Sequence, residues 1–264
     1  MLRVENAILF NNWKCFESYQ GKVDRIYYGS EFCGSLLPTP ADIDRLVEIR
    51  RETKISFSIV TPYLNQRGMK RFLRLLTFID RNCPGIEVVV IDWGSVHVIR
   101  EQFPGVVIVL GRVLSRQKRA PFVKTESGII RMEELGLSHA DKMYLKSSIL
   151  QNDYLMGFVR QCGIRRLGLD NMRQGLIFQH QWMKIDLYYP YVYITTTDYC
   201  EHRRRMGFVN GGGCPCFCRD VPVARKVRMG KEWVYTHGNT QFYLNEILPV
   251  GMPAQVDRIV KIVF

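Results

Sequence analysis

Apolar residues along this chain alternate between short runs rich in β-branched residues and longer stretches with helical spacing. Short runs of this kind, each closed by a turn, are typical of βα units that build a parallel sheet. They predict strands at residues 25–29, 54–61, 86–92, 106–111, 166–170, 184–189 and 192–197, and an additional strand at 4–10.

Helical patterns fill the intervals between these runs. After Thr39, a favourable N-cap residue, apolar residues recur at helical spacing from Ile43 to Ile49. Residues 65–81 place Phe72, Leu75, Leu76 and Ile79 on one helix face. Two further helices are predicted at 95–102 and 152–162.

Strands that alternate with helices over about 200 residues fit a closed barrel better than an open sheet. The sequence therefore predicts an α/β fold, a (β/α)8 TIM-like barrel, incomplete or distorted, as a single domain over residues 1–264. The weakest part is 119–148, which shows a helix but no clear strand, so a hidden strand is expected at 144–148. A hydrophobic fraction of 47% supports one large core.

Charge and hydropathy indicate the kind of partner and the cellular location to expect. The formal net charge of +12 implies an anionic partner, with nucleic acid, an acidic protein, lipid headgroups and a polyanionic small molecule all open. No apolar run approaches the roughly 20 residues of a membrane span. The first residues lack the basic start and long apolar run of a signal peptide, so we expect a cytoplasmic protein without a membrane span.

The carboxyl ends of barrel strands usually carry the chemistry. The strand at 25–29 runs into Cys33, that at 86–92 ends at Asp92, that at 106–111 runs into Arg112, and that at 192–197 runs toward Cys200. If 192–197 is the last strand, barrel closure brings Cys200 beside Cys33.

The chain contains eight cysteines, and in a reducing compartment clustered thiols bind metal more often than they form disulfides. Three of them, Cys214, Cys216 and Cys218, lie within five residues beside a run of glycines. Four thiolates suit an iron–sulfur cluster or zinc, and the absence of C-x2-C pairs favours the cluster. Because Pro215 restricts the backbone, one thiol is expected to be left out, and we assign Cys214 and Cys218 as ligands.

Several segments of the chain occur together in a known family. They are YYGSEFC at 27–33, DWG at 92–94, VLGRVL at 109–114, and residues 191–200 with the later Cys214 and Cys218. In these segments the chain resembles the collagenase-like peptidase U-32 family, and within it the UbiV-like branch. The residues HGNTQ at 237–241 are similar to the family's N-G-x-Q element. The chain departs from the pattern at Ser30 and by the extra Cys216.

The resemblance implies a 4Fe-4S cluster held by Cys33, Cys200, Cys214 and Cys218. It also implies oxygen-independent hydroxylation of a ubiquinone precursor in a heterodimer with a UbiU-like family member, with prephenate as the oxygen donor. Related members hydroxylate tRNA or rRNA bases. Protease activity is not expected, because neither a Ser/His/Asp arrangement nor an H-E-x-x-H motif is present.

Three residues are candidates for binding an anionic or aromatic small molecule. Arg112 is the natural anchor for a carboxylate, because a guanidinium forms two parallel bonds with it. Asp92 and Tyr63 are the other candidates. In the competing interpretation Arg112 forms a structural ion pair with Asp92, or Asp92 only caps the following helix.

Three other functions remain open at this point. An RNA-base hydroxylase would use the positive charge directly. A non-catalytic subunit would carry the cluster as an electron relay for its partner. A structural zinc protein would use the same thiols.

Overall fold

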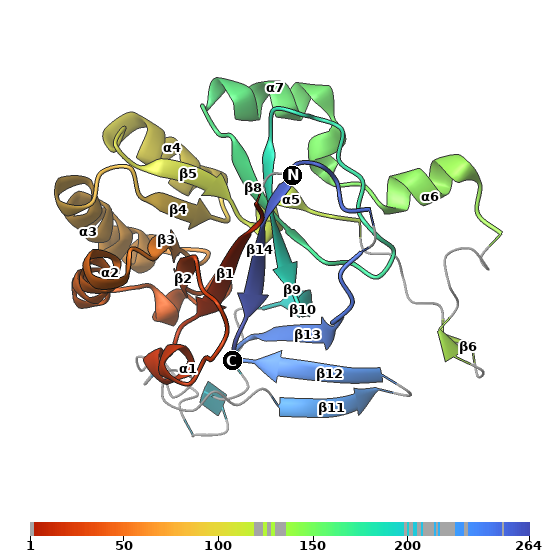
Figure 1. Ribbon diagram of the computed structural model, residues 1–264, viewed down its shortest axis with the longest axis horizontal. Helices are drawn as coiled ribbons and strands as arrows, with labels where there is room; N and C mark the ends of the chain where they lie inside the picture. Colours follow the sequence, from red (N-terminus) through yellow and green to blue (C-terminus); the bar gives the residue numbers. More distant parts are fainter. Residues whose placement is uncertain are drawn as a thin grey trace.

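The computed structural model describes residues 3–118, 124–125, 128–129, 136–197, 200, 203–204, 207, 214, 216, 225–229, 232–249 and 251–264. Eight parallel strands close into a barrel in the order β1-β14-β9-β8-β5-β4-β3-β2 (Figure 1). They are β1 (Glu5–Phe10), β2 (Arg25–Gly29), β3 (Ser56–Val60), β4 (Glu87–Val90), β5 (Val107–Leu110), β8 (Arg166–Asp170), β9 (Lys184–Tyr189) and β14 (Val256–Ile262). The predicted TIM-like α/β barrel is confirmed.

The helices of the described residues all lie between β1 and β8 in the sequence and pack around the barrel. They are α1 (Trp13–Glu17), α2 (Pro40–Thr53), α3 (Gln66–Asn82), α4 (Trp93–Gln102), α5 (Arg112–Ser115), α6 (His139–Leu145) and α7 (Asp153–Gln161), with short 3-10 turns η1 (Gly34–Leu36) and η3 (Ile149–Gln151). Thr39 caps α2 in a capping box, as its sequence position predicts, and Asn65 and Asn152 cap α3 and α7. The barrel is distorted, since residues 171–183 join β8 to β9 without a helix.

The eighth barrel strand is β14, which corrects the assignment of 192–197 as the last strand. That run forms β10 (Tyr191–Thr196), which opens a four-stranded antiparallel sheet of order β10-β13-β12-β11. Its other strands are β11 (Arg225–Met229), β12 (Glu232–His237) and β13 (Thr240–Leu244). The strand expected at 144–148 is also wrong, since α6 extends to Leu145 and Ser148 forms only an isolated bridge with Gln117. A two-stranded hairpin joins β6 (Lys124–Thr125) and β7 (Gly128–Ile129).

The antiparallel sheet lies against the carboxyl ends of the barrel strands, toward which the barrel arrows point in Figure 1. The ring of Phe32, which follows β2, contacts Tyr193 of β10 and Phe242 of β13, with centroids 5.1 and 5.9 Å apart. The amide of Asn171 donates to the carbonyl of Asn245. The sheet therefore forms one wall of the barrel mouth.

The opposite end of the barrel is closed by charged side chains. The guanidinium of Arg258 donates to three carboxylates, those of Glu5 (2.5 Å), Glu87 (2.9 Å) and Asp186 (3.2 Å). Above this network the barrel is filled by a buried apolar cluster of Ala7, Leu9, Tyr27, Val60, Val89, Val109, Tyr188, Val260 and Ile262. With the interior filled, a site is left to the carboxyl ends of the strands.

Asp42 in the first turn of α2 joins three elements of the barrel wall. Its carboxylate accepts from the backbone N–H and hydroxyl of Thr39 (2.8 and 2.7 Å), the hydroxyl of Tyr28 (2.8 Å) and the indole of Trp13 (3.3 Å). Burial raises the pKa of Asp42, but these hydrogen bonds outweigh burial and hold the pKa below its usual value.

We expect Asp42→Asn to lower the free energy of unfolding at neutral pH by about 1–2 kcal/mol. Because the folded-state pKa lies below the unfolded one, the carboxylate stabilises the protein above about pH 4 and loses this effect as the pH falls through the folded pKa. The difference between wild type and variant in urea denaturation should therefore shrink as the pH is lowered. Asp44→Asn, at an exposed position of the same helix, is the control and should change little. A difference that stays constant into acid would contradict the assignment.

Candidate functional site

Cys33 lies where the chain leaves β2 and enters the mouth of the barrel. It is the N-cap of η1, and the backbone N–H of Leu36 donates to its carbonyl at 2.9 Å. The side chain is half-buried, and the backbone N–H of Ser35 lies close enough to the sulfur to lower its pKa. The thiol therefore has a defined position at the end of a barrel strand.

Asn239, in the turn between β12 and β13, brings the start of the second cysteine segment to Cys33. Its side-chain amide donates to the carbonyls of Phe32 (2.7 Å) and Thr197 (2.6 Å). Phe32 directly precedes Cys33, and Thr197 lies three residues before Cys200. The two cysteines therefore approach through the antiparallel sheet and not through barrel closure, which corrects the route expected from the sequence.

Three further thiols gather around Cys33. The pKa of Cys33 is raised to about 11, chiefly by burial; the Ser35 N–H opposes this shift, and the nearby thiols of Cys214, Cys200 and Cys216 contribute to it. The sulfur of Cys216 also donates to the carbonyl of Ser35 at 3.4 Å. Thus a segment more than 160 residues away in sequence places its thiols around the end of β2.

The thiols near Cys33 can be compared with the requirements of a single metal ion and of a cluster. Among the described residues, no group of three Cys, His, Asp or Glu side chains converges closely enough to hold one metal ion. Ligands of a four-iron cluster stand further apart than ligands of one ion, because each sulfur binds a different iron. Cys218, the fourth predicted ligand, lies outside the described residues. Soft, half-buried thiols from two segments fit an iron–sulfur group by their chemistry.

Beside Cys33, Glu31 and Arg112 form the centre of a buried ionic triad. The backbone N–H and Nε of Arg112 donate to the two oxygens of Glu31 at 2.8 and 2.5 Å, and its Nη1 donates to Asp170 at 2.9 Å. All three side chains are at most 2% exposed. Burial alone would lower the pKa of Arg112, but the two carboxylates raise it, so the guanidinium stays charged.

The triad depends on the glycine that precedes Arg112. A Cβ on Gly111 would lie 2.6 Å from an oxygen of Glu31 and 2.6 Å from a methyl group of Ile91. Only glycine lets the carboxylate reach the backbone N–H of Arg112 at the start of α5. The guanidinium lies over the ring of Tyr188, 4.4 Å from its centroid. Burial raises the pKa of Glu31 despite the bonds from Arg112.

The two other candidate residues have different environments. The carboxylate of Asp92 accepts from the backbone N–H and the hydroxyl of Ser95 (2.7 and 2.8 Å) and so caps α4, as one interpretation expected. The ion pair of Arg112 forms with Glu31 and Asp170, and the competing pairing with Asp92 is wrong. Tyr63 is 65% exposed at the end of β3. A role of these residues in binding a substrate stays a prediction.

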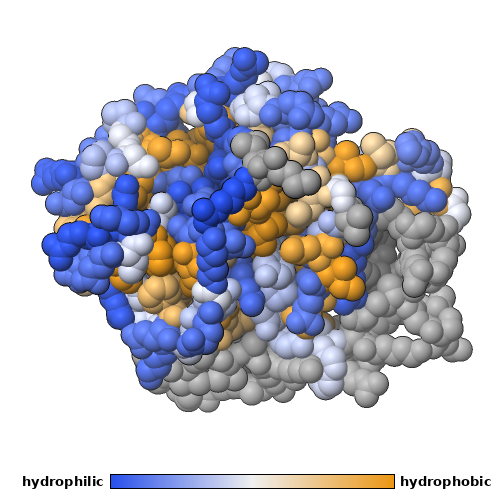
Figure 2. Space-filling view, in the orientation of Figure 1, coloured by the Kyte–Doolittle hydropathy of each residue, from blue (hydrophilic) through white to orange (hydrophobic). Residues whose placement is uncertain are grey.

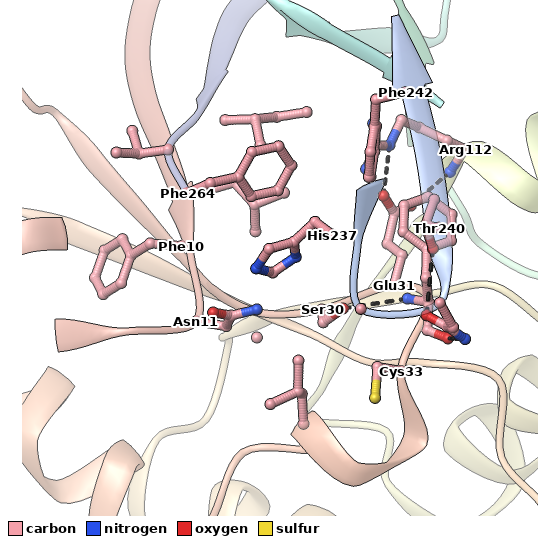
Figure 3. A pocket seen from close by; sticks show the side chains of 18 residues that line it. Phe10, Asn11, Ser30, Glu31, Cys33, Arg112, His237, Thr240, Phe242 and Phe264 are labelled. Carbon is pink, nitrogen blue, oxygen red and sulfur yellow. Dashed lines mark hydrogen bonds and ion pairs between the residues drawn. The ribbon is translucent and has the colours of Figure 1, made fainter. Parts of the chain in front are cut away.

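Two hollows meet at Glu31. The mouth cavity, of about 250 Å³, is lined by Glu31, Phe32, Tyr63, Ile91, Val113, Thr196 and Thr197. Since a cavity of about 150 Å³ accepts a benzene ring, the mouth cavity has room for an aromatic ring with substituents. The inner pocket, which includes Cys33, Arg112 and His237, holds only about 30 Å³. Figure 3 shows Glu31 turned toward Arg112 in the inner pocket, and the thiol of Cys33 turned away from this pair.

Glu31, Asp170 and Asn239 belong to this site but had no role in the sequence interpretation. Glu31 and Asp170 both stand at the carboxyl ends of predicted strands, so the rule that identified Arg112 and Cys33 could have found them. Asn239 lies within the HGNTQ segment, which was similar to a family element but to whose residues no role was assigned.

No helix in the described part of the chain is long and apolar enough to cross a membrane. No family model, no curated protein and no solved structure matches the chain. The family resemblance of the sequence therefore stays a proposal.

Proposed function

We propose that the chain is the iron–sulfur subunit of an oxygen-independent hydroxylase of the UbiV-like type, which works with a second family member. Cys33, Cys200, Cys214 and Cys218 would hold a 4Fe-4S cluster. The observation that supports this most is the gathering of Cys200, Cys214 and Cys216 around Cys33 at the barrel mouth.

The reaction is a hydroxyl transfer that needs no dioxygen. An aromatic C–H and a donor R–OH are converted to an aromatic C–OH and R–H. The aromatic carbon loses two electrons, the donor carbon gains two, and a hydrogen moves in the opposite direction to the hydroxyl group. Prephenate is the donor that the family resemblance implies. A bound cluster would supply one-electron transfer.

The residues of the mouth would bind and orient the aromatic substrate. Tyr63 is exposed and offers a ring face for stacking, and Phe32 and Ile91 give the cavity apolar walls. Glu31 also lines the cavity, and the bonds from Arg112 hold its buried carboxylate in position behind the cavity wall. Arg112 would thus act as a positioning residue through Glu31, since its guanidinium is already paired with two carboxylates.

Purification without oxygen tests the proposal. We expect brown protein with about four iron and four sulfide per chain, and an electron paramagnetic resonance signal after reduction. Hydroxylation of a quinone-precursor ring should then require the UbiU-like partner and the oxygen donor together. Colourless protein that contains zinc but no iron would contradict the proposal. A stable cluster without any hydroxylation in the complete mixture would favour the electron-relay function instead.

A further inference from the structure

The outward face of α3 carries a row of positive side chains that the cluster site does not use. Arg67, Lys70, Arg71, Arg74 and Arg81, here called the α3 cation row, are all exposed. At 3.6 residues per turn they fall within an arc of about 100°, opposite the buried face of Phe72, Leu75, Leu76 and Ile79. The row is about 21 Å long at 1.5 Å per residue.

Further cations extend this surface at the end of α2. Figure 1 shows α2 and α3 side by side on the left of the barrel, and Figure 2 shows a strongly hydrophilic surface there. Arg50, Arg51 and Lys54 line a groove of about 590 Å³ that includes Asn82, the neighbour of Arg81. Residues 45–81 contain nine Lys and Arg against three Asp and Glu, which is half of the net charge of +12.

These cations have no ion-pair partner among the described residues. None of the ion pairs formed in the described part of the chain includes a member of the α3 cation row or of the groove. By contrast, the neighbouring Arg45 pairs with Glu17 at 2.8 Å and lies over the ring of Trp13. A row of exposed, unpaired arginines lowers its own repulsion by binding an extended polyanion.

We propose that the α3 cation row binds the phosphate backbone of single-stranded nucleic acid. Side chains three or four positions apart on a helix stand about 5–6 Å apart, a spacing that long, flexible cations can match to successive phosphates. A membrane surface fits less well, because the exposed face of α3 has no large apolar side chain to insert and its apolar face is packed against the barrel. The row begins at Arg67, four residues after Tyr63, so one end of a bound strand would lie near the mouth cavity and the strand would run away from the mouth along α3. This inference does not depend on the proposed function.

Fluorescence anisotropy with labelled oligo(U) and oligo(dT) of about twelve nucleotides tests the binding. We expect the triple variant Arg67→Glu/Arg71→Glu/Arg74→Glu to bind at least tenfold more weakly than wild type. The slope of log affinity against log salt should decrease in magnitude by about 2, since each phosphate contact contributes about 0.7 on a single strand. The matched control Lys14→Glu/Lys22→Glu/Arg165→Glu changes the same charge at exposed positions elsewhere and should lose less than threefold.

Other results would overturn the proposal. Equal losses in the two triple variants would mean that only net charge attracts the strand. Tighter binding to polyglutamate or to phosphatidylserine vesicles than to either oligonucleotide would identify an acidic protein or a membrane as the partner. Cys33→Ser should bind the oligonucleotides like wild type, which separates failure of this proposal from failure of the cluster proposal.

Discussion

Replacing Cys33 by serine should reduce the iron and sulfide content of anaerobically purified protein to background. Cys33 is the one predicted ligand that comes from the N-terminal half of the chain, and serine lacks the soft sulfur that iron–sulfur clusters require. Serine at Cys200, Cys214 or Cys218 should have the same effect. Iron and sulfide analysis with the visible absorbance spectrum measures the loss, and circular dichroism checks that each variant folds.

Cys216→Ser is the matched control for this series. The sulfur of Cys216 donates to the carbonyl of Ser35, and a serine hydroxyl can donate there too, so the segment should keep its position. We expect this variant to retain its iron. A full complement of iron in Cys33→Ser would contradict the assigned ligand set. If Cys216→Ser lost its iron while Cys214→Ser or Cys218→Ser kept it, Cys216 would be the ligand in place of the cysteine whose variant kept its iron.

Replacing Arg112 by methionine should lower the free energy of unfolding by about 3–5 kcal/mol, because the carboxylates of Glu31 and Asp170 would lose their buried cation. Both carboxylates are fully buried, so water would not replace the lost guanidinium. Urea denaturation followed by circular dichroism measures the change, and the cluster-free Cys33→Ser background separates the effect of the triad from that of metal.

Two companion variants distinguish this cause from a general effect of removing arginine. Arg100→Met removes an exposed pair with Glu101 and should change the free energy of unfolding very little, because water screens the pair. The triple variant Arg112→Met/Glu31→Gln/Asp170→Asn removes all three charges and should be more stable than Arg112→Met alone. If Arg112→Met were as stable as Arg100→Met, the ionic triad would not contribute to the free energy of unfolding as expected.

Helix and strand patterns were largely readable from the sequence because they depend on local spacing. The strands at 25–29, 166–170 and 184–189 occur with the predicted bounds, and Thr39 caps its helix as predicted. The strand at 192–197 exists as well, but its partner is β13 and not a barrel strand. Period-two spacing identifies a strand without naming its neighbour.

The sequence by itself determined the barrel class, the barrel strands up to β9, the helices α2, α3, α4 and α7, and the residues that crowd the carboxyl ends of the strands, including Cys33 and Arg112. Only the tertiary structure decided that β14 closes the barrel, that Arg112 pairs with Glu31 and Asp170, and that Asn239 brings Cys200 toward Cys33. The division has a physical reason. Periodicity and capping act within a few residues, whereas these pairings join groups 42 to 253 positions apart, and burial and hydrogen-bond geometry in the folded chain select them.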